Sequence, residues 1–322
     1  MDIVVMHNSN DKVPIVITQE HIDTIKKHAD NVRWFQTEEE ILASGVDAEA
    51  ICWGGSGIPP EKFCAQSKRL KWFNTFSSGV DPLVKSKIAG LPIKVTNAKG
   101  AHAPSMGLVT LGYCIWHLRK FGEIRDNQKS HIWKKPIPTG AEAAGQTLGI
   151  VGAGAVGEYV AEYAKAVGFK VIGVKRSVVQ LKNFDEMYSD KELDKALSMM
   201  DFVVTLTPLT DRTHHLMNEA RFAAMKKGAF FINIARGGIV DEKALVRALE
   251  SGHLSGAALD ATDPEPLPPE SPLWGMSNVF ITPHCSADSP FLTDRAVEQF
   301  CRNIESFKAG RPLFNTVDLR NL

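Results

Sequence analysis

The chain has 322 residues, which is enough for two domains that each bury a hydrophobic core. It carries 37 acidic and 37 basic residues, so its net charge is formally zero and gives no electrostatic reason to expect nucleic acid or an anionic membrane as a partner. Its five cysteines are scattered without a C-x-x-C pair, which argues against a disulfide framework or a zinc site, and we predict no metal centre.

The N-terminus has no basic segment ahead of a long apolar run, so it does not look like a secretory signal. The most apolar helical stretch covers residues 107–118 and is too short to cross a bilayer. Free thiols suit a reducing compartment. These features predict a cytoplasmic protein without a membrane-spanning segment.

Short apolar strands and helical patterns alternate over the N-terminal third of the chain. Strands are predicted at residues 2–6, 32–36, 50–53, 72–75 and 93–96, and helices at 20–28, 38–43 and 60–64. This alternation indicates a parallel sheet with helices on both faces, in a first domain that ends near Gly100.

Two segments of this domain are candidates for substrate contact. A strand runs into the turn Phe76–Asp81, where the backbone N–H groups of Ser78 and Gly79 form the kind of hollow that binds a carboxylate. The local residues fit an ordinary strand-to-helix turn equally well. The second segment is the glycine-rich loop 53–57, where Trp53 either lines a substrate pocket or packs on its own domain.

A mostly apolar helix is predicted from Pro104 to Phe121. It carries no evident chemistry, and we interpret it as a connector whose apolar face packs on another helix, in the same or in a second subunit. The turn-rich residues 138–140 then lead into the next strand.

The stretch Leu148–Ser177 has the pattern of a dinucleotide-binding unit. An apolar strand is followed by Gly152, Gly154 and Gly157 in the order G-x-G-x-x-G, then by a helical pattern and a second strand at 170–174. Such glycines permit, in turn, a tight turn, the close approach of a pyrophosphate, and close packing of helix on strand, while the helix N-terminus offers N–H groups to the phosphates. Glycines alone often only make turns, but the complete context predicts a bound dinucleotide.

The end of the second strand indicates which dinucleotide is bound. An acidic residue there would bind the ribose 2′-hydroxyl of NAD, but the chain has Lys175, Arg176 and Ser177 instead. Two cations and a hydroxyl suit a 2′-phosphate, so the prediction is NADP as the preferred cofactor, with NAD as the alternative. The competing interpretation is a solvated strand end, where lysine and arginine are common.

The rest of the chain completes this second domain. Further strands are predicted at 201–206, 229–234, 256–259 and 279–282, and helices at 219–225 and 242–251. Together with the two strands of the dinucleotide-binding unit, they predict a six-stranded doubly wound sheet.

Three loops that follow these strands carry side chains suited to hydride chemistry on a 2-oxo acid. Arg236 can hold the substrate carboxylate and polarise the keto oxygen, and His284 can give a proton to that oxygen as hydride arrives. Glu265 can orient the imidazole and favour its charged form, and Asp260 can bind the nicotinamide carboxamide. Taken alone, Arg236 fits a surface ion pair and His284 an ordinary loop histidine. Their joint position after successive strands favours the chemical interpretation.

With these motifs in place, the chain resembles the D-isomer-specific 2-hydroxyacid dehydrogenases. The matching pieces are GIVGAGAVG, TPLTDRT, MKKGAFFINIARGGIVDEKALVRAL, GAALDATDPEPLPPESPLW and ITPH, in that order. The resemblance implies an α/β fold of two doubly wound parallel-sheet domains with a cleft between them: a flavodoxin-like substrate domain (1–102 and 289–322) and a Rossmann domain (103–288). It also implies that the last helix, 292–309, returns to the first domain, that the cleft closes on substrate, and that a homodimer forms largely through the nucleotide-binding domains.

The resemblance further implies which residues form the site. It places an Arg–Glu–His catalytic set on Arg236, Glu265 and His284, and backbone binding of the substrate carboxylate at Ser78 and Gly79. The complete expectation is substrate contact from Trp53, Phe76, Ser78, Gly79, Arg236 and His284, and cofactor contact from Gly152, Gly154, Ala155, Val156, Gly157, Lys175, Arg176, Ser177, Thr207, Pro208, Ala235 and Asp260.

Within the family, the basic end of the second strand and the loop tryptophan look like the NADPH-using glyoxylate and hydroxypyruvate reductases. We therefore expect reduction of a small 2-oxo acid to the D-2-hydroxy acid. One alternative is a reductase of larger branched or aromatic 2-oxo acids, which a pocket around Trp53, Phe76 and Met276 would accommodate. Another is a dinucleotide-sensing binding protein of the same fold. The connector helix lacks a glutamate that the family usually has near its start, and this departure concerns the fine specificity and the dimer contacts rather than the reaction.

Overall fold

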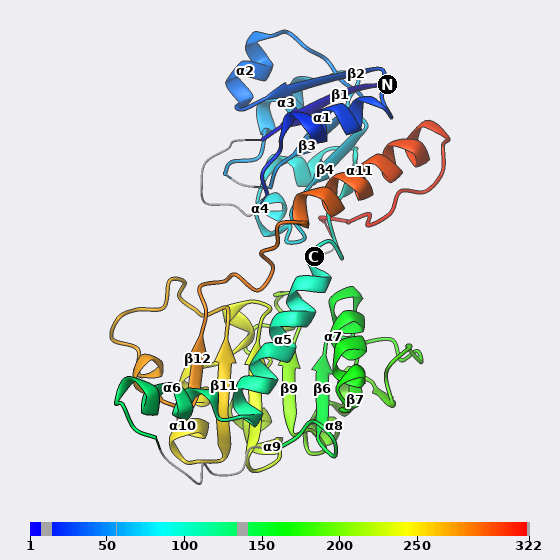
Figure 1. The fold of residues 1–322 in the computed structure, drawn as a ribbon. Coiled ribbons are helices and arrows are strands. Elements are labelled where there is room, and N and C mark those ends of the chain that lie inside the picture. The colour runs from blue at the N-terminus through cyan, green and yellow to red at the C-terminus, as the bar shows by residue number, and fades with distance from the viewer. Residues whose placement is uncertain (8–14, 56, 134–140, 321–322) are drawn as a thin grey trace. The chain divides into compact units, whose positions relative to one another are not determined.

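The computed structural model describes residues 1–7, 15–55, 57–133 and 141–320. The chain divides into two compact units, one made of Met1–His102 with Asp288–Leu322 and the other of Ala103–Ala287 (Figure 1). Within the described residues each unit is organised around one parallel β-sheet, which confirms the predicted α/β class. Ser56 of the glycine-rich loop and the predicted turn at 138–140 lie outside the described residues.

The first unit is built on a five-stranded sheet with the strand order β2-β1-β3-β4-β5. Its elements are β1 (Asp2–Met6), α1 (Gln19–Lys26), β2 (Asn31–Phe35), α2 (Glu38–Ala43), β3 (Ala50–Trp53), α3 (Glu61–Gln66), β4 (Trp72–Thr75), α4 (Asp81–Val84), the 3-10 helix η1 (Lys87–Gly90), β5 (Lys94–Thr96) and α11 (Leu292–Lys308). All neighbouring strands are parallel, and the order is that of flavodoxin-like sheets. The C-terminal helix α11 belongs to this unit and packs beside α1.

Strand β1 shows why an interior strand of this sheet is a continuous apolar run. Side chains alternate along a strand, so Ile3 and Val5 face one side of the sheet and Val4 and Met6 face the other. The first pair packs in a hydrophobic cluster that includes Phe300 of α11, and the second pair in a separate cluster. Both faces are therefore buried, which removes the polar alternation of a half-exposed strand.

The second unit is built on a seven-stranded parallel sheet with the order β12-β11-β10-β9-β6-β7-β8. Its strands are β6 (Thr147–Val151), β7 (Lys170–Val174), β8 (Glu186–Tyr188), β9 (Phe202–Thr205), β10 (Ala229–Asn233), β11 (Leu254–Leu259) and β12 (Val279–Ile281). Its helices are α5 (Ala103–Leu118), α6 (Phe121–Lys129), α7 (Ala155–Ala166), α8 (Leu193–Leu197), α9 (Glu219–Ala224) and α10 (Glu242–Glu250), with 3-10 helices η2 (Asp190–Glu192), η3 (Gly237–Ile239) and η4 (Pro272–Gly275).

The prediction of six strands was wrong by one. The additional strand β8 has three half-buried residues and pairs only with β7, at the edge of the sheet. Its sequence, Glu-Met-Tyr, lacks the apolar run or alternation by which a strand is recognised. The remaining strand positions agree with the predicted segments to within two residues at each end, because most of those strands are recognisable apolar runs.

The predicted connector helix is shorter than expected and is followed by a second helix. Helix α5 ends at Leu118, and Lys120 has the left-handed φ of 55°, which interrupts the helical path before α6 begins at Phe121. None of the helices in the described residues is long and apolar enough to span a membrane.

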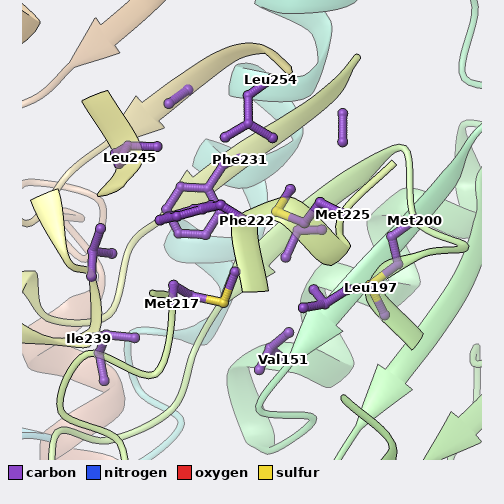
Figure 2. Packing of buried hydrophobic residues seen from close by; sticks show 14 of the residues in the cluster. Val151, Leu197, Met200, Met217, Phe222, Met225, Phe231, Ile239, Leu245 and Leu254 are labelled. Carbon is purple, nitrogen blue, oxygen red and sulfur yellow. The ribbon is translucent and has the colours of Figure 1, made fainter. Parts of the chain in front are cut away.

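The core of the second unit lies on the two faces of its sheet. One cluster includes Val151 of β6, Phe231 of β10 and Leu245 of α10, as Figure 2 shows. The other cluster includes Ile150 and Phe230, the chain neighbours of two of these residues. Helices therefore cover both faces of the sheet. The loops at the carboxyl ends of the strands remain accessible, and this is where sheets of this type bind ligands.

Candidate functional site

The turn between β6 and α7 has the geometry of a phosphate-binding loop. Gly152 has a φ of +105°, and a Cβ there would lie 2.8 Å from backbone atoms of Leu206 and Thr207, so only glycine fits. A Cβ at Gly154, the N-cap of α7, would meet nothing within 4 Å, so the backbone there is open to an approaching group. At Gly157 a Cβ would lie 3.1 Å from Ile150 Cγ2, so its absence allows α7 to pack on β6.

These three positions match the three roles that the motif predicts for its glycines. Ala155 and Val156 are the first residues of α7, and the N–H groups of a helix's first turn have no partner within the helix. They are therefore suited to bind phosphate oxygens, with the positive end of the helix dipole behind them.

Thr207 gives an independent indication that a polar ligand belongs beside this turn. Among the described residues, its hydroxyl is one of the few buried side-chain groups with no hydrogen-bond partner. An unmet buried polar group costs about 1–3 kcal/mol. Thr207 lies directly against Gly152, so a dinucleotide held by the glycine-rich turn would offer hydrogen-bonding groups to this hydroxyl. The following residue, Pro208, has its carbonyl bound by the Thr213 hydroxyl at 2.6 Å, which shapes the loop.

The basic residues Lys175, Arg176 and Ser177 follow β7 directly, as predicted. The Lys175 N–H donates to the Tyr188 carbonyl of β8 at 3.0 Å, which fixes where the loop leaves the sheet. Lys175 is half-buried, and Arg176 and Ser177 are exposed. Within the part of the chain that the structure describes, neither cation pairs with a carboxylate, so their charge is available to an anion.

Arg236 lies in the loop after β10, which Asn233 holds in shape. The fully buried Asn233 amide donates to the carbonyls of Arg236 at 3.0 Å and Ala261 at 3.1 Å. Its oxygen accepts from the Thr205 hydroxyl at 2.9 Å and the Ala235 N–H at 3.2 Å. Asn233 thus links the ends of three strands, a role that the sequence prediction missed.

The loop of Arg236 lies directly against the loop that follows β11. A Cβ at Gly237 would lie only 1.9 Å from the carbonyl oxygen of Thr262, so the two backbones are in contact there. Arg236 itself is half-buried and donates to the Ala235 carbonyl at 2.7 Å. The preceding residue of this loop, Ala235, is buried, with 7% of its surface exposed.

The predicted pair of His284 and Glu265 is formed. Nδ1 of His284 lies 2.7 Å from Oε1 of Glu265, and both side chains are part exposed, at 40% and 43%. An ionised carboxylate can only accept, so Nδ1 carries the proton in this pair and Nε2 is the nitrogen left to face a substrate. His284 has a φ of 51°, a left-handed conformation that is uncommon for a residue with a side chain and that tends to occur at functional sites.

Asp260 connects the loop after β11 to the loop of His284. Its carbonyl accepts the His284 N–H at 2.9 Å. Its carboxylate, 2% exposed, accepts the Cys285 N–H at 2.9 Å and the Ser286 N–H at 3.0 Å. The same carboxylate accepts the Thr282 hydroxyl at 2.6 Å. The sequence prediction gave Asp260 a contact with the cofactor only, and missed that it organises the backbone around His284.

In the first unit, the turn at Ser78 and Gly79 is held from both sides. The Ser78 hydroxyl donates to the Ala98 carbonyl at 3.1 Å, and the Asn97 amide donates to the Ser78 carbonyl at 2.7 Å. Within the described residues, the N–H groups of Ser78 and Gly79 donate to no acceptor. A turn of this kind can bind a carboxylate through its backbone.

Trp53 and Phe76, which were expected to contact substrate, are both buried. Trp53 is 2% exposed and its ring centroid lies 6.3 Å from that of Phe73. Phe76 is 0% exposed and packs edge-on against Phe300 of α11. Met276, the third residue of the pocket expected for larger substrates, packs against the hydrophobic cluster of the second unit. These positions favour packing roles over contact with a ligand.

Clusters of three or more histidine, cysteine, aspartate or glutamate side chains that could hold a metal ion do not occur in the described residues. The polar groups of this edge of the sheet are instead arranged for anions and for proton transfer. They are the open helix N-terminus, the basic loop after β7, a guanidinium and an imidazole–carboxylate pair.

The family model of the D-isomer specific 2-hydroxyacid dehydrogenase, NAD binding domain, matches residues 111–286. The chain belongs to this family. It is 34% identical over 285 residues to a glyoxylate reductase of Thermofilum pendens, an alignment that covers 86% of this chain and 83% of that protein.

Solved structures of the family have the same fold. A D-isomer specific 2-hydroxyacid dehydrogenase of Xanthobacter autotrophicus in complex with NADPH and MES is similar with a TM-score of 0.83 and 30% identity, over 99% of both chains. An NADPH-dependent glyoxylate/hydroxypyruvate reductase of Sinorhizobium meliloti in complex with NADP and sulfate has a TM-score of 0.81 and 29% identity, again over 99% of both chains.

The chain is therefore an NAD(P)-dependent D-2-hydroxyacid dehydrogenase, an oxidoreductase that acts on a 2-oxo acid with a nicotinamide dinucleotide as cofactor. This confirms the predicted family, the fold class and the reaction class. The glycine turn, the first residues of α7 and the unpaired Thr207 hydroxyl fit that cofactor.

Proposed function

We propose that this dehydrogenase is an NADPH-preferring reductase of small 2-oxo acids of the glyoxylate and hydroxypyruvate type, with His284 as the proton donor. The observation that carries the proposal is the 2.7 Å contact between His284 and Glu265, on a loop whose backbone is fixed by Asp260. The names of the relatives from Thermofilum pendens and Sinorhizobium meliloti support the substrate class.

The chain's own residues divide the remaining tasks. The bound dinucleotide supplies the hydride that reaches the keto carbon. Arg236 binds the carboxylate and the keto oxygen, because a guanidinium presents several donors in one plane. Its charge stabilises the negative charge that develops on that oxygen during reduction. His284, when both of its ring nitrogens carry a proton, delivers the Nε2 proton to the oxygen and is left neutral with its proton on Nδ1. Glu265 accepts from Nδ1 throughout and keeps the imidazole ring oriented.

Two further contacts complete the substrate and cofactor proposal. The N–H groups of Ser78 and Gly79 bind the substrate carboxylate. Asp260 uses three of the roughly four acceptor positions of a carboxylate in its contacts to Thr282, Cys285 and Ser286, so one position is left for the nicotinamide carboxamide.

The preference for NADPH rests on the residues after β7. Lys175 and Arg176, which pair with no carboxylate of the described residues, and the Ser177 hydroxyl suit a 2′-phosphate. The run contains no carboxylate to bind a 2′-hydroxyl. The solved relatives that hold NADPH or NADP support the same choice.

The test is a substrate panel in which NADPH or NADH consumption is followed by absorbance. We expect turnover with glyoxylate and hydroxypyruvate, and a higher kcat/KM with NADPH than with NADH. Faster turnover of branched or aromatic 2-oxo acids than of glyoxylate would replace the proposal by the larger-substrate alternative. Cofactor binding without turnover of any 2-oxo acid would favour a dinucleotide sensor.

We also propose a homodimer that forms through the second unit. Large apolar side chains are exposed along α5 and just beyond it, with Leu108 at 64%, Phe121 at 48% and Ile132 at 53%. Exposed apolar patches of this kind mark interaction surfaces. Light scattering of the wild-type chain and of Leu108→Glu checks this, because a wild-type monomer contradicts it. All five cysteines are free thiols, which supports the proposal of a cytoplasmic protein.

A further inference from the structure

A buried tyrosine on α5 is joined to the loop of His284 by a chain of two short hydrogen bonds. The Tyr113 hydroxyl lies 2.6 Å from the Thr282 hydroxyl, and the Thr282 hydroxyl donates to Asp260 Oδ1 at 2.6 Å. Tyr113 is 3% exposed, and its ring packs edge-on against Phe280 of β12. The phenol is therefore held in place by packing as well as by its hydroxyl.

The direction of the hydrogen bonds follows from the protons that are available. An ionised carboxylate only accepts, so the single proton of the Thr282 hydroxyl points to Asp260. Tyr113 must then be the donor in the hydrogen bond between the two hydroxyls, and Thr282 the acceptor. Burial raises the pKa of Tyr113, so the phenol keeps this proton at neutral pH. The chain runs in one direction, from Tyr113 through Thr282 to Asp260.

Asp260 in turn fixes the backbone of the loop that carries His284. Three successive backbone N–H groups, those of His284, Cys285 and Ser286, donate to its carbonyl and carboxylate oxygens at 2.9, 2.9 and 3.0 Å. These bonds to Asp260, together with the bond from the His284 N–H to the Thr282 carbonyl at 3.0 Å, fix the backbone at His284, which has a left-handed conformation. Any rotation of the Asp260 carboxylate would loosen two of the three bonds at once.

We infer that Tyr113 is a positioning residue for the proton donor: its hydroxyl fixes Thr282 and thereby the Asp260 carboxylate that shapes the backbone at His284. The inference rests on the proposed role of His284. The Tyr113 hydroxyl bonds to Thr282, and no hydrogen bond among the described residues joins it to the glycine turn or to the basic loop after β7. Its loss should therefore disturb the proton-transfer geometry more than the affinity for the dinucleotide, to which Asp260 is proposed to contribute a single acceptor position.

The first experiment compares Tyr113→Phe with Tyr159→Phe, a matched substitution at an exposed tyrosine of α7. Loss of one net hydrogen bond lowers the occupancy of the aligned loop, so we expect kcat to fall about three- to tenfold in Tyr113→Phe. The Kd for NADPH, measured by fluorescence titration, and the KM for the 2-oxo acid should stay within about twofold of wild type. Tyr159→Phe should match wild type in all three.

The second experiment tests the hydrogen-bond chain from Tyr113 to Asp260 by substituting its middle member, Thr282. Thr282→Ser keeps the hydroxyl and should retain most of kcat, whereas the similarly shaped Thr282→Val removes it and should lower kcat at least as much as Tyr113→Phe. In the Thr282→Val background, Tyr113→Phe should have little further effect, because two substitutions that break the same chain are not additive.

Three outcomes overturn the inference. The first is a lower melting temperature of Tyr113→Phe with unchanged kcat, which identifies a purely structural tyrosine. The second is a loss of NADPH affinity that accounts for the whole effect. The third is full additivity of the two substitutions. His284→Ala separates this inference from the proposed function: if that variant is inactive while Tyr113→Phe is fully active, only the positioning role fails, and if it is active, the proton-donor proposal fails as well.

Discussion

Gly237→Ala provides the sharpest test of how the catalytic loops are held together. The Cβ of alanine would stand 1.9 Å from the Thr262 carbonyl oxygen, and real Cβ contacts essentially never fall below 3.0 Å. The two loops must therefore separate by about 1 Å, and both atoms involved are backbone or directly attached to it, so no side-chain rotation relieves the contact. One loop carries Arg236 and the other leads to Glu265.

The expected consequence is a loss of activity with little loss of cofactor affinity. A displacement of about 1 Å of groups that position a substrate can cost about 10²-fold, so we expect kcat/KM to fall by about this factor. NADPH affinity, measured by fluorescence titration, should fall much less than kcat/KM. The glycine turn and the basic loop after β7 lie outside these loops, and among the expected cofactor contacts only Ala235 and Asp260 lie in or beside them. This affinity also reports that the variant is folded.

Gly275→Ala is the matched control in the same unit. A Cβ at Gly275 would meet nothing within 4 Å, so the same chemical change there should leave kcat/KM as in wild type. Wild-type kcat/KM in Gly237→Ala would refute the reasoning, because it would mean that the contact between the two loops does not set the position of Arg236 relative to its partners.

Three further predictions concern single side chains. In His284→Ala, kcat for 2-oxo acid reduction should fall by about 10²–10⁴-fold, the contribution of a positioned acid, with an unchanged Kd for NADPH by titration. Arg176→Ala should raise the KM for NADPH about tenfold or more and leave that for NADH nearly unaltered, and equal losses for both cofactors would remove the 2′-phosphate assignment. His117 is stacked on Phe230 with ring centroids 4.2 Å apart, and burial, with a smaller effect of Lys120, lowers its pKa to about 4. The folded state thus resists protonation, so urea unfolding should show stability falling by about 1–3 kcal/mol from pH 6.5 to 4 through this group, and His117→Phe should lose less over that range.

The parts of the fold that the sequence predicts well are those in which local pattern and burial agree. In β10, the run Ala229–Asn233 is apolar almost throughout because both faces of the strand are covered, and such a run is recognisable without knowing its neighbours. The dinucleotide turn is predictable for a related reason. The spacing of its glycines is local in sequence and falls between an apolar strand and a helical pattern, although the atoms that exclude a side chain at Gly152 belong to the distant residues Leu206 and Thr207.

The parts that the sequence did not predict depend on partners distant in the chain. Strand β8 is a strand only because β7 offers it an edge, and the left-handed turn at Lys120 that separates α5 from α6 is not marked by a glycine. Trp53 is another example. A tryptophan in a glycine-rich loop fits both a pocket wall and a core residue, and only the packing around it, against Phe73, distinguishes the two.

The candidate site shows the same limit at the level of chemistry. Arg236, Glu265 and His284 were predicted from residue type and from their place after strands, whereas the residues that join them have no distinctive local pattern. Asn233 reads as the polar end of an apolar strand, and Asp260 as one acid among several in its loop. Their importance comes from burial, at 0% and 2% exposure, combined with hydrogen bonds to neighbouring loops.

The strand order of the sheet explains why these two residues are sufficient to connect the site. Strands β9, β10, β11 and β12 lie side by side, and a buried polar residue at or just after a strand end binds the next loop in each case. The Thr205 hydroxyl donates to Asn233, Asn233 donates to the Ala261 carbonyl, and Asp260 accepts the backbone of Cys285 and Ser286. A displacement at one loop is therefore passed to the next through backbone groups, which have few alternative conformations. Asn233→Ala should on this ground impair catalysis by groups it does not touch, since it removes the bonds that tie the Arg236 loop to the loop before Glu265.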